Sequence, residues 1–394
     1  MDLASFAALL TPRGQLALSR AMALAPTEST FLTCFGKMAK QFDQVLARVA
    51  LETALLRSRA AVKFRRAERM YFVRQALEQA SSELVARHRA ASLAQRLKTR
   101  PRLLDLGCGI GGDTLALAGF ADVTAVDIDP LRLAMAEQNV RVYEVSAHFH
   151  HGDGLSMDTS FEVLYTDPDR RVGGRRQLSL EACLPALSAV RERFARQAIV
   201  AKLAPGVPEQ EVRLLGGEAE YVSLDGELKE CVWWSPPLAT ARVRATILPH
   251  EQTLTSDDPL SPPPPNSPGD WLIDPCPAVV RAGLVGELAA RLNAWPLEPG
   301  IAYLSANEWT PTPWARAWRI RAAMPFHLAR LRDYLRLQGI GPINLMRRGV
   351  PYDLEELSRK LKRSGSEAAQ VVLCPHQGKP WAIVCHLATA PADL

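Results

Sequence analysis

The stretch LLDLGCGIGGDTLALA, residues 103–118, decides how this sequence is expected to fold. It begins with a short, mainly apolar run typical of a buried strand, and it ends with apolar residues at helical spacing. Between the two runs stand glycines at positions 107, 109, 111 and 112. Glycine allows a tight turn and a close approach of a ligand, and the start of a helix offers free N–H groups. The stretch therefore predicts a strand, a ligand-binding loop and a helix.

The same alternation continues on the C-terminal side of this stretch. Residues 230–235 and 241–248 read as two strands joined by a short loop, which predicts a terminal antiparallel hairpin. Apolar strands separated by helices indicate a mostly parallel sheet covered on both faces, so the fold class is α/β. The parallel strands are predicted at 102–106, 122–127, 147–151, 161–167 and 197–203, and the helices at 112–120, 130–140 and 178–194.

The rest of the sequence divides into three parts. Residues 1–98 repeat apolar residues at three- and four-residue spacing, are rich in alanine and predict an all-α N-terminal domain. Residues 251–270 include the run SPPPPNSPG, whose prolines favour an extended linker. Residues 271–394 predict a small α/β module. The alternating domain is expected to span 99–250.

The net charge of +5 is distributed unevenly. Residues 1–100 contain 17 Lys and Arg against 7 Asp and Glu, which gives +10. Residues 101–329 contain 20 against 29, or −9, and residues 330–394 contain 10 against 6, or +4. An acidic centre between basic ends suggests that the ends meet a polyanion, and a solvated basic helix is the alternative.

The overall composition is that of an ordinary globular protein, with 47% hydrophobic and 23% charged residues among 394. No run of about 18 apolar residues occurs, so no transmembrane helix is expected. The N-terminal MDLASFAALLTPRGQ lacks the basic start of a signal peptide. Seven cysteines occur without a CxxC pair, which favours reduced thiols over disulfides or zinc. We therefore expect a cytoplasmic protein.

The glycines alone fit two kinds of cofactor. Read as G-x-G-x-x-G, positions 107, 109 and 112 fit a dinucleotide, and read as D-x-G-x-G-x-G, residues 105–111 fit S-adenosylmethionine. The carboxyl ends of parallel strands meet at the ligand-binding edge of an open α/β sheet. Four acids close successive strands there, and such an acidic edge suits an ammonium and a sulfonium better than a pyrophosphate. These acids are Asp105, Asp127, Asp153 and Asp167.

Three of these carboxylates have an expected partner on S-adenosylmethionine. Asp105 is expected to meet the ammonium group, Asp127 both ribose hydroxyls, and Asp153 the adenine amino group. Neighbouring residues of the same motifs complete the predicted cofactor site, namely Gly107, Cys108, Gly109, Gly111, Ile128 and Gly154.

The motifs DLGCGIGGDTLALA, VTAVDIDP, HHGDG and LYTDPDRR resemble, in this order, those of class I S-adenosylmethionine-dependent methyltransferases. This resemblance covers about residues 100–250 and implies a Rossmann-like methyltransferase sheet.

The whole chain is similar to a bacterial methyltransferase group with a helical N-terminal region and a C-terminal THUMP-like domain. The segments KFRRAERMYFVRQALEQAS and LQGIGPINLMRRGVPYDLEELSRKLKRSGSEAAQVVL carry this similarity. The helical lead-in also resembles that of trimethylguanosine synthases. THUMP domains are associated with RNA, so the resemblance implies an RNA partner.

The motif LYTDPDRR places Asp167 and Pro168 at the end of a predicted strand. In amino-group methyltransferases, an Asn or Asp, two prolines and an aromatic residue orient a weakly nucleophilic amino group. The resemblance implies this role for Asp167 and the Pro168 carbonyl. Arg170 and Arg171 are expected to hold a phosphate nearby.

The motif departs from that pattern at two positions. Asp169 stands in place of the second proline, and Arg170 stands in place of the aromatic residue. Tyr165 or an aromatic residue of the N-terminal region is then left to stack on a base. Lys202, at the end of the fifth strand, is expected either to contact the substrate or to neutralise the acidic edge.

Two other chemistries have weaker support. Covalent catalysis needs a cysteine nucleophile, but Cys183 and Cys231 lie in apolar contexts typical of packing. His148 and His150 share one strand face and His151 lies opposite, so these histidines predict no compact metal site.

Basic residues cluster in Leu56–Arg74, which holds seven of them with one acid and three aromatic residues, Phe64, Tyr71 and Phe72. This mixture suits a phosphate backbone and unstacked bases, and core packing explains the aromatic residues equally well. The candidates for RNA binding are Arg65, Arg66 and Arg69 here and Arg347 and Arg348 in the C-terminal module.

The expected function is S-adenosylmethionine-dependent methylation of a nucleobase in structured RNA, tRNA or rRNA, by direct transfer. Two alternatives stay open. The same core methylates a protein or a small molecule, or the chain is an RNA-binding protein with a vestigial cofactor domain. Neither a metal nor a membrane partner is expected.

Overall fold

The computed structural model describes residues 1–158, 160–169, 171–172, 175–176, 179–257, 261–361 and 364–387. Contacts divide the chain into two compact units. Unit 1 comprises Met1–Ala219 with Glu230–Thr240, and unit 2 comprises Glu220–Lys229 with Ala241–Leu394. The domain limits expected from the sequence, at 98, 250 and 270, stay predictions.

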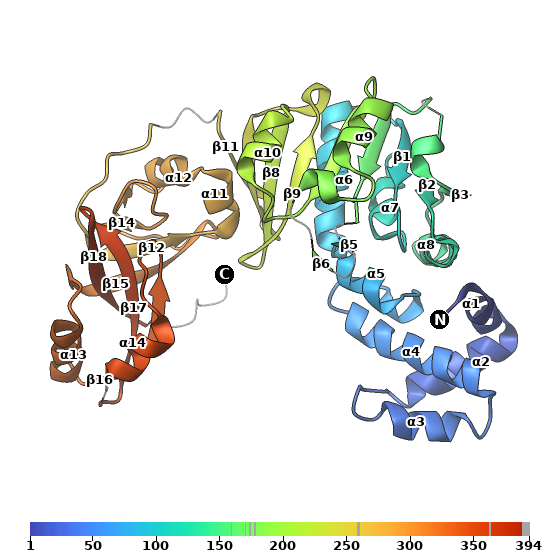
Figure 1. Ribbon diagram of the computed structural model, residues 1–394, viewed down its shortest axis with the longest axis horizontal. Helices are drawn as coiled ribbons and strands as arrows, with labels where there is room; N and C mark the ends of the chain where they lie inside the picture. The colour runs from blue at the N-terminus through green and yellow to red at the C-terminus, as the bar shows by residue number, and fades with distance from the viewer. Residues whose placement is uncertain are drawn as a thin grey trace. The chain divides into compact units, whose positions relative to one another are not determined.

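Helices form the N-terminal part of unit 1, as the sequence predicts (Figure 1). Asp2 and Thr11 accept hydrogen bonds from backbone N–H groups at the starts of the first two helices. Thr11 directly follows the first helix and begins the second. The helices are α1 (Leu3–Leu10), α2 (Pro12–Ala23), α3 (Phe31–Met38), α4 (Gln44–Ala60), α5 (Arg74–Gln79) and α6 (Glu83–Leu97).

A mostly parallel sheet follows and confirms the predicted fold class. Its strand order in unit 1 is β9-β7-β4-β1-β2-β3, and only β9 runs antiparallel to its neighbour β7. The strands are β1 (Arg102–Leu106), β2 (Asp122–Asp127), β3 (His148–His151), β4 (Val163–Thr166), β7 (Ala198–Leu203) and β9 (Glu227–Trp234). The connecting helices are α7 (Gly112–Leu117), α8 (Pro130–Val142), α9 (Leu187–Arg193) and α10 (Glu209–Leu214).

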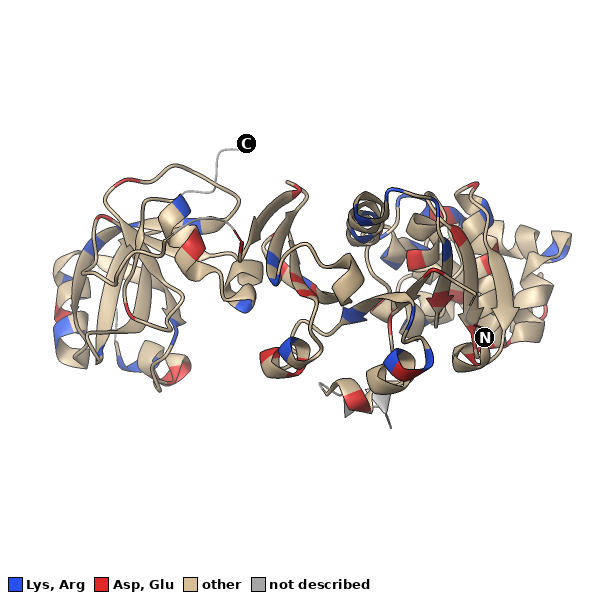
Figure 2. Ribbon diagram, turned by 90° about the horizontal axis from the view of Figure 1, so that it is seen from above, with Lys and Arg blue, Asp and Glu red and all other residues tan. Residues whose placement is uncertain are grey.

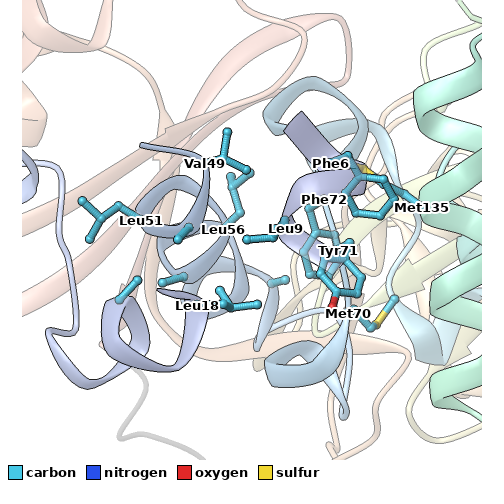
Figure 3. Packing of buried hydrophobic residues seen from close by; sticks show 14 of the residues in the cluster. Phe6, Leu9, Leu18, Val49, Leu51, Leu56, Met70, Tyr71, Phe72 and Met135 are labelled. Carbon is cyan, nitrogen blue, oxygen red and sulfur yellow. The ribbon is translucent and has the colours of Figure 1, made fainter. Parts of the chain in front are cut away.

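The N-terminal helices share one apolar core with α7 and α8. Leu115 and Met135 of the sheet-covering helices join the buried side chains of α1, α2 and α4 in this core. Phe64, Tyr71 and Phe72 lie in it as well, and Figure 3 shows Tyr71 and Phe72 among these side chains. Their burial makes them core contacts, so the alternative that they stack on unpaired bases is wrong.

The helix predicted at 178–194 is shorter than expected. A 3-10 turn occupies Leu180–Ala182, and α9 begins only at Leu187. Pro185 lies between them, and a proline has no N–H to donate and clashes with the preceding turn of a helix. Residue 178, at the start of the predicted segment, lies outside the described residues.

The strands predicted at 230–235 and 241–248 are present, but the two do not pair with each other as a hairpin. An additional strand, β8 (Glu218–Leu224), turns through Asp225 and Gly226 into β9, and β10 (Val243–Leu248) pairs instead with β8 and β11 (Gln252–Thr255). The sequence pattern missed β8 because Glu218 and Glu220 suggest an exposed segment, yet both are fully buried. Glu218 binds Arg96, and Glu220 accepts a hydrogen bond from Thr246 at 2.6 Å.

A seven-stranded sheet forms most of unit 2, in the order β13-β14-β12-β15-β18-β17-β16. Alternate residues of β17 and β18 lie in two different apolar clusters, so this sheet is buried on both faces. β12 and β15 were not predicted. The strands are β12 (Trp271–Pro275), β13 (Trp295–Pro296), β14 (Leu304–Ala306), β15 (Ala315–Pro325), β16 (Ile340–Arg347), β17 (Glu367–His376) and β18 (Lys379–His386), and the helices are α11 (Pro277–Ala282), α12 (Val285–Arg291), α13 (Leu328–Leu337) and α14 (Leu354–Lys360).

Candidate active site

The glycine loop between β1 and α7 is tied to the neighbouring strand. Gly107 N and Cys108 N both donate hydrogen bonds to the Val126 carbonyl, at 2.9 and 3.0 Å. Gly107 and Gly109 have φ of 81° and 55°, and a Cβ on either would meet nothing within 4 Å. Glycine is therefore required there by backbone conformation, and the space beside the loop is open.

Gly111, the last glycine before α7, is required for a second reason as well. A Cβ on Gly111 would lie 3.1 Å from the Ala136 Cβ, so its small size also lets the loop approach α8. Asn139, a fully buried residue of α8, supports the same loop by donating from Nδ2 to the Ile110 carbonyl at 2.9 Å. Asn139 was not a candidate from the sequence, because an asparagine in a helix carries no pattern that separates a buried position from an exposed one.

Asp127 closes β2 directly beside this loop. Its Oδ2 accepts a hydrogen bond from Gly109 N at 2.7 Å, and its Oδ1 accepts one from Asp129 N at 2.8 Å. Each carboxylate oxygen has a second lone pair, so the fixed carboxylate is still able to accept hydrogen bonds from a ligand. Ile128 follows with 73% of its surface exposed, which places an apolar side chain next to this acceptor.

Asp105 lies in β1 and is almost fully buried. Burial raises the pKa of Asp105 to about 8, the hydrogen bond that Thr114 donates to Oδ2 at 2.5 Å opposes this, and nearby carboxylates add to it. A buried carboxyl surrounded by other carboxylates is held largely as the acid at neutral pH, and an arriving cation would favour its ionisation.

Asp153 and Gly154 follow β3. Asp153 is exposed, and its Oδ1 accepts a hydrogen bond from Leu155 N at 3.0 Å, which caps a short 3-10 turn. Gly154 is buried, and a Cβ there would lie 2.8 Å from the Leu106 side chain. The glycine is thus explained by packing, whereas the exposed Asp153 carboxylate keeps free acceptor capacity.

Asp167 follows β4 at the same edge of the sheet. The register pairs Leu106 of β1 with Thr166 of β4, so Gly107 and Asp167 leave neighbouring parallel strands at the same level. Lys202 of β7 donates from Nζ to Asp167 Oδ2 at 2.5 Å. Lys202 is nearly buried, so of the two roles expected for it, this contact supports neutralising the acidic edge.

The remaining residues of the Asp-Pro motif are only partly described. Pro168 is buried, and Asp169 pairs through its backbone with Leu184. Arg170 lies outside the described residues, and Arg171 is described only as the backbone of β5 (Arg171–Val172), paired with β6 (Arg175–Arg176).

Tyr165 does not stack on a substrate base. It is 1% exposed, and its hydroxyl accepts a hydrogen bond from Arg89 Nη1 at 2.7 Å. Arg89 of α6 is itself buried and binds Glu230 of β9 at 2.7 Å and Asp113 at the start of α7. No sequence pattern indicates this cluster, because a basic residue of an amphipathic helix is normally exposed.

The basic candidates of the N-terminal region differ in how they are engaged. Arg65 binds Glu83 at 2.9 Å but stays 68% exposed. Arg66 lies over the Tyr143 ring at 5.4 Å and donates at 2.5 Å to the Val142 carbonyl, which leaves it 41% exposed. Arg69 is exposed. Arg65 and Arg69 are therefore the more accessible of the three.

The two arginines of β16 and its end also differ. Arg347 is exposed and donates to the Tyr352 carbonyl. Arg348 binds Asp274 at 3.1 Å and lies over the Tyr303 ring at 4.5 Å, so its guanidinium is already held inside unit 2.

Lys, Arg, Asp and Glu are interspersed along both units (Figure 2). Within the described ranges, no group of three His, Cys, Asp or Glu side chains comes together to hold a metal ion. No helix among the same residues is long and apolar enough to cross a bilayer. All seven cysteines are buried and free, including Cys183 and Cys231.

Comparisons with known proteins agree with this geometry. Residues 100–238 match the family model described as RNA cap guanine-N2 methyltransferase, residues 315–387 match that of a THUMP domain-like family, and residues 2–60 match a domain of unknown function. The chain is 38% identical over 339 residues to a protein of Mycobacterium tuberculosis named as an uncharacterised S-adenosylmethionine-dependent methyltransferase. That match covers 82% of this chain and 91% of the relative, and a second strain has a protein with the same figures.

The chain belongs to the S-adenosylmethionine-dependent methyltransferases. S-adenosylmethionine is accordingly the cofactor, and the predicted resemblance to the cap guanine methyltransferases and to THUMP-like domains is confirmed. A crystal structure described as that of a methyltransferase from Porphyromonas gingivalis W83 has the same fold as this methyltransferase. Its TM-score is 0.72 at 19% identity, and the match covers 92% of this chain and all of that one.

Proposed function

We propose that this methyltransferase modifies a nucleobase in structured RNA, tRNA or rRNA, by direct transfer. The proposal rests on one observation: the glycine loop and Asp167 follow two neighbouring parallel strands at the same level of the sheet. The acceptor group and the cofactor have to meet at such a point. The family model over residues 100–238 names an RNA amino group as acceptor, which supports a nucleobase here.

The cofactor fits the residues that the structure brings together. Gly107 and Gly109 leave open space beside the loop, as an adenosine derivative needs. We assign the ribose hydroxyls to Asp127, the ammonium group to Asp105 and the adenine ring to the exposed Ile128 side chain. Asp153 takes the adenine amino group in this assignment, and Gly111, Cys108 and Gly154 shape the loop and its surroundings.

The chemistry asked of the protein is mainly positioning. The cofactor supplies the methyl group when it is bound. Asp167 and the Pro168 carbonyl accept hydrogen bonds from the acceptor amino group, so that its lone pair faces the methyl carbon. In the bound state the nitrogen would form a bond to the methyl carbon while the carbon–sulfur bond breaks with its electron pair on sulfur, and the proton released from nitrogen would pass to water. Holding reactants in this way contributes roughly 7–11 kcal/mol in favourable cases.

Two further features support RNA as the partner. Residues 315–387 match a THUMP domain-like family, and Arg65, Arg69 and Arg347 are exposed basic residues outside the cofactor site. Each cationic side chain that meets a phosphate releases counterions, which gives binding without sequence preference. Arg170 and Arg171 would hold the phosphate next to the target nucleotide.

The test is a comparison of modified nucleosides in RNA from cells with and without this protein. Digested tRNA and rRNA are analysed by mass spectrometry, and the proposal expects one methylated base to disappear in the deletion strain and return on complementation. Identical nucleoside profiles in both strains, together with methyl transfer to a protein or a small molecule in an extract, would show that the substrate is not RNA.

A further inference from the structure

Helix α5 of the N-terminal region ends against the Asp-Pro motif. Gln79 Nε2 donates a hydrogen bond to Asp169 Oδ1 at 3.0 Å. The Gln79 backbone carbonyl accepts a hydrogen bond from Lys202 Nζ at 3.5 Å, and the same Nζ binds Asp167 Oδ2 at 2.5 Å. Gln79 therefore contacts both Lys202, which is the ion-pair partner of Asp167, and Asp169.

The end of α5 is itself held in place. Lys63 Nζ donates to the carbonyls of Leu77 and Ala80, each at 2.8 Å, and to that of Glu78 at 3.2 Å. These carbonyls belong to the last turn of the helix, which leaves carbonyl groups without partners in the helix itself. Lys63 lies within the basic stretch predicted to meet RNA, but its contacts hold its half-buried side chain against the end of α5, where it supports Gln79.

Asp169 has a second tie that fixes the same segment. Its N–H donates to the Leu184 carbonyl at 2.9 Å, and Leu184 N donates back to the Asp169 carbonyl at 2.9 Å. A proline, which the related amino-group motif carries at this position, has no N–H for such a pair. The departure from the two-proline motif thus gives the segment a backbone tie to Leu184 and a side-chain tie to Gln79.

We propose that Gln79 is a positioning residue for methyl transfer, which holds Asp169 and Lys202 so that Asp167 stays where the acceptor group must be placed. The inference rests on the proposed role of Asp167. Gln79 acts through its two neighbours and touches neither acceptor nor cofactor. Because a misplacement of about 1 Å can cost on the order of 10²-fold in rate, loss of this tie should lower kcat and leave cofactor affinity alone.

Three variants and one control separate this role from general support of the fold. In Gln79→Glu, two acceptor-only carboxylates face each other, so the hydrogen bond is lost and the charges repel. Asp169→Asn alone keeps an acceptor for Gln79. The double variant Gln79→Glu with Asp169→Asn restores a hydrogen bond with donor and acceptor exchanged. Gln75→Glu makes the same chemical change at an exposed position of the same helix and is the control.

The measurements are hydrogen exchange of the Asp169 and Leu184 amides, calorimetric affinity for S-adenosylmethionine, and kcat with tritiated cofactor and bulk RNA. Gln79→Glu is expected to speed exchange at both amides and to lower kcat at least about tenfold, with cofactor affinity within about twofold of wild type. The double variant is expected to recover slow exchange and most of the turnover. Gln75→Glu is expected to match wild type in all three.

Wild-type exchange and turnover in Gln79→Glu would overturn the inference, and so would a double variant no better than Gln79→Glu. If Gln79→Glu does not fold, Gln79→Met removes the donor without adding charge and is judged by the same readouts. If the wild-type protein transfers no methyl group to RNA, the proposed substrate is wrong, and the exchange of the two amides still decides the role of Gln79.

Discussion

The carboxylates at the carboxyl edge of the parallel strands have different partners, and the partner determines what each carboxylate can do. Asp127 is oriented by two backbone N–H groups, and Asp167 is neutralised by the Lys202 ammonium group. Asp105 accepts a hydrogen bond from the Thr114 hydroxyl and lies near the carboxylates of Asp113, Asp127 and Asp167. The motifs predicted that all three carboxylates lie at one edge of the sheet. They could not predict the different partners, because these contacts involve residues outside the motifs.

The raised pKa of Asp105 predicts a pH dependence of stability. Its pKa is about 8 in the folded protein against 3.8 as the ordinary value, so the folded state holds a proton that the unfolded chain has lost between these limits. The contribution of this group is therefore full below about pH 4 and falls as the pH rises towards 8. Denaturant unfolding of wild type and Asp105→Asn across pH 5–8 measures it. A difference between the two proteins that does not change with pH would contradict the assignment.

Asp127 should be the residue on which cofactor affinity depends most directly. Asp127→Ala removes charge-assisted hydrogen bonds, so we expect S-adenosylmethionine binding to weaken by about 2–3 kcal/mol. Isothermal titration calorimetry measures this change. Asp122→Ala, at the exposed opposite end of the same strand, is the matched control and should bind the cofactor like wild type. Equal affinity in both variants would remove Asp127 from the cofactor site.

At the scale of elements, α6 is attached to the sheet by buried ion pairs as well as by apolar contacts. Arg89 and Arg96 of this helix bind Glu230 and Glu218, and all four side chains are buried. Arg96 also lies 4.2 Å from the centre of the Trp234 ring. Buried ions are costly unless they are paired, so these contacts specify how the helix docks.

Removing one partner of such a pair should be strongly destabilising. Arg89→Met leaves Glu230 and Asp113 without their cation, and we expect the free energy of unfolding to fall by about 3–5 kcal/mol. Arg87→Met, two residues away in the same helix, removes a pair whose arginine is 50% exposed and should cost less than about 1 kcal/mol. Urea titration compares the two variants. A similar loss of unfolding free energy in both variants would show that burying an ion pair does not increase the cost of breaking it.

The parallel strands of unit 1 are apolar or end in recognisable motifs, so their positions in the sequence and their shared carboxyl edge could be predicted. β8 was missed because the partners of its buried glutamates, Arg96 and Thr246, lie elsewhere in the sequence. The helix predicted at 178–194 is interrupted at Pro185. The motifs predicted that their aspartates lie at one edge of the sheet, whereas Gln79, Arg89 and Asn139 were not predicted because their contacts exist only in the folded chain.

For the whole molecule, the charge pattern of the sequence overstates the accessible basic surface. Of the basic residues between Leu56 and Arg74, Arg57 is buried and Lys63 binds backbone carbonyls, whereas Arg65 and Arg69 stay exposed. A smaller set of arginines is therefore available for an RNA backbone than the composition suggests.

This view predicts how RNA binding responds to salt. The logarithm of affinity should fall linearly with the logarithm of salt concentration, and Arg69→Ala should reduce the slope by about one. Arg348→Ala is the control and should leave the slope unchanged, because this arginine is held by Asp274 and Tyr303. Filter binding of tRNA and rRNA fragments across a salt series gives both slopes. Salt-independent binding by the wild-type protein would contradict a phosphate-contacting surface.

The central claim is that Asp167 orients an acceptor group on RNA beside the cofactor. It is tested most directly by methyl transfer from tritiated S-adenosylmethionine to RNA from a deletion strain, with wild-type protein and Asp167→Ala. Because the substitution removes the hydrogen-bond acceptor that orients the amino group, we predict turnover lower by on the order of 10²-fold and nearly unchanged cofactor affinity. Near-wild-type turnover by Asp167→Ala on RNA that the wild-type protein methylates would contradict the account.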